Sequence, residues 1–406
     1  MEVKKTKSFH HIFTPIRDLL SDSRTTGVLL VICTIISLFV TNSFSNGWFN
    51  RLWNNPFVPG IFSSAKLPHS FIDWINNFGM AFFFVLAATE IKRELLSGEL
   101  SQFKKAVLPF GAAFGGMLMP ALIFIGFNFY SGYSHGWGIP TATDIAFSVA
   151  AASLLGKRFP IGLKILLLAI AIIDDLGAII VIALFYGGHI NWIALGICGA
   201  LYGGLLLCNQ MKIKFGMFQV FLGLAMWYAM LQSGVEASIT GVLFAFAIPV
   251  NSLAIIEKAI HKWVNFLILP VFALANTAIL LPAHVVASLT TPVGMGIFFG
   301  LVIGKPLGIY LACRIMVGLN VASLPSNVNW KQVFGMGTLA GIGFTMSIFT
   351  TMLAFTESGI RDIAKISILS AVVGSVIVSY FYFRAIYGKK VVPMPSTLPQ
   401  AEPAYS

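Results

Sequence analysis

The sequence predicts an all-helical membrane protein that crosses the bilayer many times. Hydrophobic residues make up 57% of its 406 residues, whereas Asp, Glu, Lys and Arg together make up only 10%. Soluble globular chains carry about a quarter charged residues, and a soluble core of this length could not bury so much apolar surface. The bilayer must therefore be the solvent for most of the chain.

Twelve apolar runs indicate the membrane-spanning helices. A spanning helix needs about 20 mostly apolar residues, and several of these runs are shorter or interrupted by glycine. In chain order the runs lie near residues 25–41, 71–91, 106–127, 137–155, 161–186, 192–208, 216–232, 235–250, 262–281, 293–313, 333–354 and 362–386. No small-residue cleavage site follows the first run, so we expect a membrane helix there and not a cleaved signal peptide.

The runs divide the chain into one membrane domain and two polar tails. We expect an N-terminal tail over 1–24, a single transmembrane domain over 25–388 and a C-terminal tail over 389–406. The segment 42–70 is the one sizeable loop on the side opposite the tails, and its tryptophans suit the bilayer interface. Its Gly and Pro spacing allows a small hairpin, and an irregular interfacial loop fits the same residues equally well.

The basic residues orient the spans. Of the 26 Lys and Arg residues, nearly all fall on one side when the N-terminus is placed inside. The exceptions are Arg51, Lys66, Arg361 and Lys365 on the opposite side, and Lys305 within the membrane. This asymmetry predicts an even number of spans with both termini cytoplasmic. It also accounts for the net charge of +11 without nucleic-acid binding.

The cysteines and histidines do not indicate a bound cofactor. The four cysteines are scattered in or beside apolar runs and form no C-x-x-C pair. Neither a zinc site nor a disulfide framework is therefore predicted. The seven histidines show no metal-ligand spacing either. We expect no cofactor.

Four charged residues stand clearly in the interior of predicted spans, away from the span ends: Asp144, Asp174, Asp175 and Lys305. Each such group costs roughly 2.5–3.5 kcal/mol on insertion scales. These groups persist only where they are paired or face a water-filled cavity, so they are candidate functional residues.

The aspartate pair Asp174-Asp175 is the strongest candidate, in the string A-I-A-I-I-D-D-L-G-A. Two adjacent carboxylates cannot both ionise cheaply in a low dielectric. A bound monovalent cation offsets that cost and so does a proton, which makes the two mutually exclusive occupants. An antiporter needs that competition. The alternative is a structural pair held by a salt bridge, and on a helix the two side chains point about 100° apart.

Two further segments favour broken helices. In I-P-T-A-T-D-I-A-F-S, Pro140 interrupts the helix before Thr143 and Asp144. Their oxygens suit a hard cation, or Asp144 only neutralises helix-end partial charges. The Gly-rich stretch 335–347, which includes Gly341, Gly343 and Thr345, is typical of close helix packing. An unwound span facing a cavity fits it too.

Lys305 is the only basic residue in the middle of a predicted span. Its string G-K-P lacks the upstream phosphate loop of a nucleotide-binding motif. Lys305 either pairs with a carboxylate of the aspartate pair or steadies a helix C-terminus.

A second charged cluster is predicted at the cytoplasmic face. Glu90, Arg93 and Glu94 share one helix face. A similar group comes later in the chain: Glu257, Lys258 and His261. Both groups suit ordinary solvated helix ends. They also suit a cation funnel or a pH-responsive network, because histidine changes charge near neutral pH.

Taken together, these strings resemble the NhaA-type bacterial sodium/proton antiporters. The resemblance covers roughly residues 15 to 390. The matching strings are E-I-K-R-E-L at 90–95, T-A-T-D-I-A-F at 141–147, A-I-I-D-D-L-G-A at 171–178, I-L-P-V-F-A-L-A-N at 268–276, G-K-P-L-G-I at 304–309 and G-I-G-F-T-M-S-I-F at 341–349.

The resemblance implies a twelve-helix fold with inverted repeats. The spans around Asp144 and Gly341 would be interrupted and cross near the membrane midplane. It assigns cation binding to Asp175 and Asp174, with Thr143 nearby. Asp144 and Lys305 would balance the facing helix ends, and Lys305 would release Asp174 when that carboxylate takes a proton.

The resemblance also implies an activity and a setting. The activity is exchange of sodium or lithium for a larger number of protons across the bacterial inner membrane, serving sodium and pH homeostasis. The two cytoplasmic groups would supply pH activation, and 42–70 would form a dimer-contact hairpin. Glu236 and Lys258 stand where family members can carry His, which leaves the pH range open.

Two other classes fit the sequence less well. An intramembrane carboxylate enzyme would need a G-x-G-D string or a third spaced aspartate, and the sequence has neither. A cation channel would need repeated filter elements, and a lone lysine among the transport residues argues against a cation pore.

Overall fold

The computed structural model describes residues 23–43, 47–56, 67–156, 159–188, 190–282, 285–325 and 327–387. Within these ranges every regular element is a helix, and the β pairing consists of one isolated bridge between Pro56 and Ser70. The all-helical class is therefore confirmed. Almost all of both predicted tails, and the centre of the loop at 42–70, lie outside the described residues.

Eight helical stretches of the described chain are long and apolar enough to cross a membrane, and a bent pair makes a ninth. The stretches are α2 (Ser23–Ser43), α4–η2–α5 (Phe71–Trp74, Ile75–Gly79, Met80–Ser97), α6 (Phe103–Asn128), α8 (Ile161–Phe185), α9 (Trp192–Gln210), α12–η7–α13 (Val250–Trp263, Val264–Ile268, Leu269–Asn276), α15–η8–α16 (Pro292–Phe299, Gly300–Gly304, Lys305–Gly318) and α19 (Ser358–Tyr387). The bent pair is α17 (Trp330–Ala340) with α18 (Phe344–Ala354).

Shorter helices fill the three remaining predicted runs. They are η4 (Ser134–Thr141) with α7 (Ile145–Leu154), α10 (Met217–Ser233), and η6 (Ala237–Ile239) with α11 (Thr240–Ala247). In the part of the chain that the structure describes, three small helices lie between the spans: α3 (Trp48–Asn54), η3 (Glu99–Ser101) and α14 (Val285–Leu289). Each predicted run thus contains helix, and the count of twelve spans stays a prediction.

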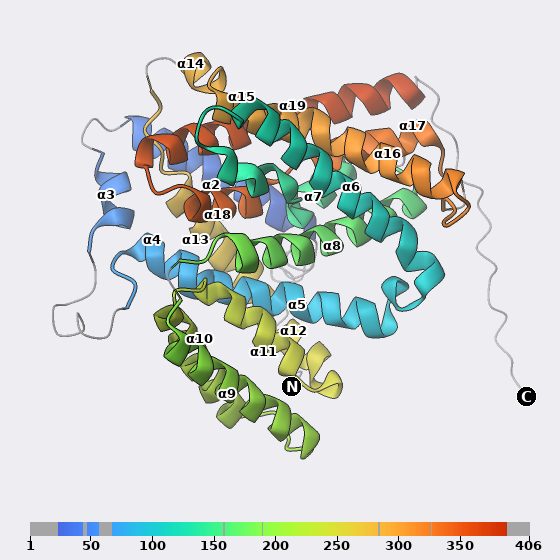
Figure 1. Cartoon of the computed structure of the whole chain (residues 1–406). Helices are drawn as coiled ribbons and strands as arrows, with labels where there is room; N and C mark the ends of the chain where they lie inside the picture. The colour runs from blue at the N-terminus through green and yellow to red at the C-terminus, as the bar shows by residue number, and fades with distance from the viewer. Residues whose placement is uncertain are drawn as a thin grey trace, which may run out of the picture.

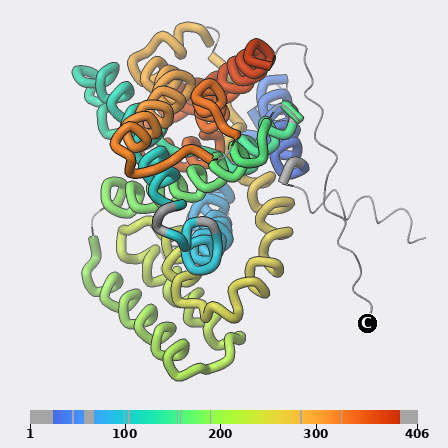
Figure 2. Tube along the Cα trace, turned by 90° about the vertical axis from the view of Figure 1, so that its right-hand side faces the viewer, coloured from blue at the N-terminus to red at the C-terminus, as the bar shows by residue number. Residues whose placement is uncertain are grey.

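The helices α9 and α10 pack together at one end of the molecule, away from the main bundle (Figures 1 and 2). They bury their own small apolar core, which includes Cys198, Leu205 and Met226. The other long helices share one large core, to which α8 contributes Leu163, Leu167 and Ile170. The aspartate pair is carried by the helix at the centre of this larger core.

Close backbone packing holds α16 against α6. A Cβ atom at Gly308 would lie only 2.1 Å from the carbonyl oxygen of Gly115, so the glycine permits a contact that another residue would block. Just before α16, the wider turn of η8 brings Gly304 against the backbone of Pro120. Such π-turns often occur at functional sites. Here the turn ends directly before Lys305, which therefore enters the core.

Two segments leave helical geometry inside the bundle. The backbone is extended at Ala142 and Asp144, between η4 and α7. The axes of α17 and α18 meet at 50° across the break at 341–343. The two breaks touch, because the Asp144 amide donates a hydrogen bond to the carbonyl oxygen of Ile342 at 2.7 Å. The Gly-rich stretch contains this interruption and also a close packing contact, because a Cβ at Gly337 would lie 2.6 Å from Cα of Pro306.

Candidate ion-binding site

The aspartate pair lies at the buried centre of α8. The Asp174 side chain is 0% exposed and Asp175 only 4%. The Lys305 ammonium lies 2.8 Å from Oδ2 of Asp174, and both side chains are fully buried. The Thr143 hydroxyl donates to the same oxygen at 2.7 Å. The structure thus brings Thr143, Asp174 and Lys305 together, and it shows that the salt-bridge interpretation holds for Asp174.

One oxygen of each aspartate has no such partner. Among the described residues, Oδ1 of Asp174 and Oδ1 of Asp175 are buried and accept no hydrogen bond. A buried polar atom without a partner is rare and costly, most of all on a carboxylate. Carboxylate and hydroxyl oxygens are the ligands that hard cations prefer. These two oxygens therefore fit a bound cation or a proton.

Asp144 joins the two interrupted segments. Its Oδ1 accepts a hydrogen bond from the Phe147 amide at 3.0 Å and caps α7. Its Oδ2 accepts from the Thr345 amide at 3.1 Å and from the Thr345 hydroxyl at 2.6 Å, at the start of α18. A carboxylate at helix N-termini is stabilised by their partial positive charge. Because both oxygens already have partners, the geometry favours charge balance by Asp144 over direct cation binding.

Lys305 does the opposite of Asp144, because its positive charge lies at a helix C-terminal end. Its ammonium donates to the carbonyl oxygen of Thr141 at the C-terminal end of η4. The Thr143 hydroxyl also lies 2.9 Å from the carbonyl oxygen of Ala340, the last residue of α17. Carbonyl groups at helix ends carry partial negative charge, which a cation offsets. Lys305 therefore contacts a helix end and Asp174 at once, so both sequence interpretations hold.

A cavity of about 220 Å³ connects the aspartate pair with the predicted cytoplasmic cluster. Its lining includes Asp175, Thr143, Asp144 and Thr345 from the buried site. It also includes Glu90, Arg93, Glu94 and His261 from the cluster. Arg93 forms an ion pair with Glu257 at 2.8 Å, whereas Lys258 is exposed. Five of the six cluster residues therefore line this cavity or contact its lining.

Sequence reasoning missed several hydroxyl and amide groups that hold the breaks. The Ser148 hydroxyl donates to the carbonyl oxygen of Leu339 at 2.9 Å, and that of Ser347 donates to Ile139 at 2.7 Å. Asn265 lines the cavity and contacts the His261 ring. Ser148 had a readable signal, because it lies one helical turn after Asp144 and shares its face. Asn265 had none.

Tyr186 fixes the far end of α8, where it is the residue that follows the last helical turn. Its hydroxyl accepts a hydrogen bond from the Gly138 amide at 3.0 Å and donates one to the carbonyl oxygen of His135 at 2.8 Å. This contact ties the helix of the aspartate pair to η4.

An all-helical membrane bundle with buried charges at the contact of two broken segments is typical of secondary membrane transporters. The sequence model of the family described as Na+/H+ antiporter 1 matches residues 17–383. The chain belongs to this family.

Named relatives agree over nearly the whole chain. A protein named Na(+)/H(+) antiporter NhaA from Flavobacterium psychrophilum is 42% identical over 93% of this chain and 97% of its own length. One from Cytophaga hutchinsonii is 42% identical over 91% of this chain and 94% of its own. Na(+)/H(+) antiporter NhaA 2 from Clostridium beijerinckii is 38% identical over 94% and 98%.

Proposed function

We propose that this chain exchanges sodium or lithium for protons, with Asp175 and Asp174 as the shared site. The observation that carries the proposal is the pair of buried carboxylate oxygens without a partner among the described residues, Oδ1 of each aspartate. Either ion satisfies them, and neither can do so while the other is bound. The names of the relatives, which are sodium/proton antiporters, support the same activity.

Asp175 is the proposed cation ligand. It lines the cavity of about 220 Å³, whereas Asp174 does not. A cation entering from the cavity therefore meets Asp175 first, with the Thr143 hydroxyl beside the pair. The orphan oxygen of Asp174 completes an all-oxygen donor set of the kind that hard cations prefer.

Asp174 and Lys305 are the proposed proton-linked partners. While Asp174 is ionised, it holds the Lys305 ammonium at 2.8 Å. A proton on Asp174 removes that attraction and frees the ammonium to rely on helix-end carbonyls such as that of Thr141. The ion pair therefore links the protonation of Asp174 to the contact between α8 and α16. A motion of these helices would carry the site from one side of the membrane to the other.

The cavity suggests the entry route and the regulation. Glu90, Glu94 and Glu257 give its mouth an acidic character that attracts cations. Arg93 and His261 stand beside them, and a change in the charge of His261 would alter the field at the mouth. We infer that this group forms the cation funnel and the pH-responsive element, with Lys258 exposed at its edge.

The remaining assignments follow from the same proposal. The chain is a transporter and not an enzyme. It has twelve spans in inverted repeats that cross near the midplane at the two breaks, and it resides in the bacterial inner membrane with both termini cytoplasmic. The segment 42–70 makes the contact of a homodimer. Its partners are the transported ions and the lipid bilayer, with no cofactor and no nucleic acid.

Transport by reconstituted protein tests the proposal. Full-length protein is placed in vesicles with an imposed pH gradient, and the collapse of the gradient is followed after sodium or lithium is added. We expect wild type to collapse the gradient and Asp175→Asn to leave it intact. Asp73→Asn is the matched control, because Asp73 caps α4 through Ser70 outside the cavity lining and should leave exchange unchanged.

Three results would contradict the proposal. Collapse by Asp175→Asn at the wild-type rate would remove the site assignment. A wild-type protein that moves no protons in response to either ion would remove the function. Sodium flux with no coupled proton movement would indicate the channel alternative.

A further inference from the structure

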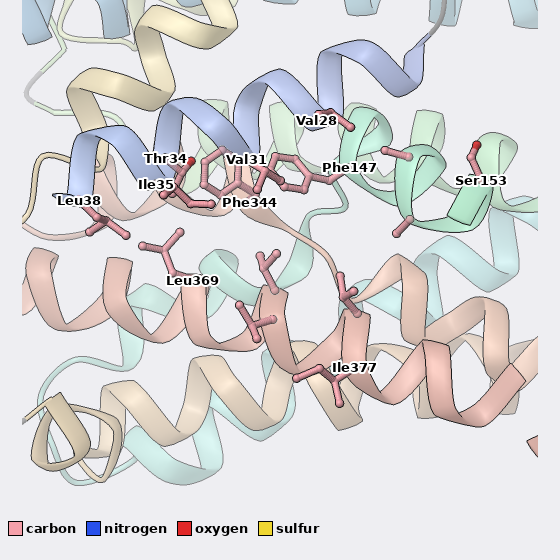
Figure 3. A pocket seen from close by; sticks show the side chains of 16 residues that line it. Val28, Val31, Thr34, Ile35, Leu38, Phe147, Ser153, Phe344, Leu369 and Ile377 are labelled. Atoms are coloured by element: carbon pink, nitrogen blue, oxygen red, sulfur yellow. The ribbon is translucent and has the colours of Figure 1, made fainter. Parts of the chain in front are cut away.

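An apolar groove of about 540 Å³ runs between α2 and α19. Side chains from these two helices, and from α7 and α18, face it (Figure 3). Its volume lies within the roughly 300–1,000 Å³ of ordinary ligand pockets. We call it the α2–α19 groove, and its walls are marked by Ile35, Phe147, Phe344, Val373 and Ile377.

The lining selects an apolar occupant. Among the described residues that line the groove, only Thr34 and Ser153 place hydroxyl groups in its wall. Each is already used, because Thr34 donates to the carbonyl oxygen of Leu30 and Ser153 to that of Val149, both at 2.8 Å. A polar ligand entering the groove would therefore lose its bonds to water and find no partner in exchange.

The groove lies between two helices that are expected to cross the hydrocarbon core, so its open side would face lipid. Both α2 and α19 are apolar enough to span a membrane. Several walls are open to the outside of the bundle, since Ile35 is 60% exposed, Val373 58% and Ile377 50%. The apolar material available at such a surface is the acyl chain of a bilayer lipid.

A positive charge beyond one end of the groove favours a lipid with an anionic headgroup. Arg384 lies in the last turn of α19, seven residues after Ile377 and so on the same helix face, about 10 Å further along the axis. Its side chain is exposed, and within the described chain no carboxylate forms an ion pair with it. An arginine at a helix end near a membrane surface suits an anionic phosphate group.

We propose that the α2–α19 groove binds one acyl chain of an anionic phospholipid whose headgroup meets Arg384. The acyl chain would press on the two interrupted segments, because Phe147 and Phe344 pack together in the groove wall with their ring centroids 4.7 Å apart. The Phe147 amide binds Asp144, and Phe344 directly precedes Thr345. The bound lipid therefore braces the contact between the two breaks.

Photolabelling tests the proposal without measuring transport. Full-length protein is reconstituted in vesicles that contain a phosphatidylglycerol or a phosphatidylcholine tracer with a diazirine on its acyl chain. Labelled peptides are then quantified by mass spectrometry. We expect phosphatidylglycerol to label the groove face of α19 and α2 in wild type.

Two substitutions should remove the label for separate reasons. Val373→Trp fills the groove, and since each lost methylene contact changes affinity roughly fourfold, labelling should fall about tenfold or more. Ile35→Trp makes the same test from α2 if Val373→Trp fails to fold. Arg384→Gln should reduce the preference for phosphatidylglycerol over phosphatidylcholine about fivefold.

Matched controls decide between a site and ordinary lipid contact. Val378→Trp alters an exposed residue of α19 outside the groove lining, and Lys331→Gln removes an exposed basic residue near the start of α17. Both should label as wild type does. Equal labelling of Val373→Trp and Val378→Trp would overturn the groove as a site. Equal wild-type labelling by the two tracers would overturn the role of Arg384.

Discussion

Replacing Lys305 by alanine should destabilise the protein as well as impair transport. The substitution removes the ammonium 2.8 Å from Asp174 and leaves a fully buried carboxylate without its cation. It also removes the donor to the Thr141 carbonyl at the end of η4. The substitution therefore breaks the contacts that join α16 to α8 and to η4.

The size of the loss follows from burial. Breaking a buried ion pair from one side costs roughly 3–5 kcal/mol, because the remaining charge stays in a low dielectric. Asp174 can limit that cost by taking a proton, so we expect the deficit to be smallest at low pH and to grow as the pH rises. Lys305→Ala combined with Asp174→Asn removes both charges and should recover much of the stability.

Thermal unfolding in detergent measures this difference. Wild type, Lys305→Ala, the double variant and Lys331→Ala are compared across a range of pH. Lys331 is exposed at the start of α17, so its removal should cost well under about 1 kcal/mol. If Lys305→Ala unfolds at the same temperature as Lys331→Ala at every pH, then the buried ion pair does not stabilise the fold and the argument fails.

Two further predictions test other contacts of the site. Gly341→Ala places a Cβ 2.4 Å from the Leu301 carbonyl oxygen and should cost about 1–3 kcal/mol. Gly359→Ala, whose Cβ meets nothing within 4 Å, should cost nothing measurable in thermal unfolding. Thr345→Val removes a hydroxyl donor to Asp144 and should cost about 1.5–3 kcal/mol. Thr350→Val removes only a bond to Met346 within α18, so equal costs would contradict the special role of the Asp144 contact.

The sequence alone predicted the membrane class and located the buried charges, because burying apolar runs or charges in the wrong solvent costs free energy. Apolar runs of membrane length cannot be hidden in a soluble core, and a charge inside one must have a partner or a function. That argument selected Asp174, Asp175, Asp144 and Lys305 without reference to the fold. An ion pair between Lys305 and one of the two aspartates was one of two interpretations of the sequence. The structure shows this ion pair, with Asp174.

The partition of roles could not be predicted from the residues. Adjacent aspartates look equivalent in a sequence, yet only Asp175 lines the cavity and only Asp174 has the lysine. The difference arises because α8 turns about 100° per residue, which points the two side chains at different neighbours. Likewise Asp144 showed two equal interpretations until Phe147 and Thr345 were found to occupy its oxygens. Long-range contacts between the breaks decide these roles.

The competition of sodium with protons at the aspartate pair is the central claim, and the heat of sodium binding measures it most directly. Calorimetric titration of full-length protein in detergent gives the apparent Kd for sodium at several values of pH. If the two ions compete, the Kd rises as the pH falls, and Asp175→Asn shows no saturable heat. A Kd that does not change with pH, or sodium binding that survives in Asp175→Asn, would contradict a site shared by the two ions.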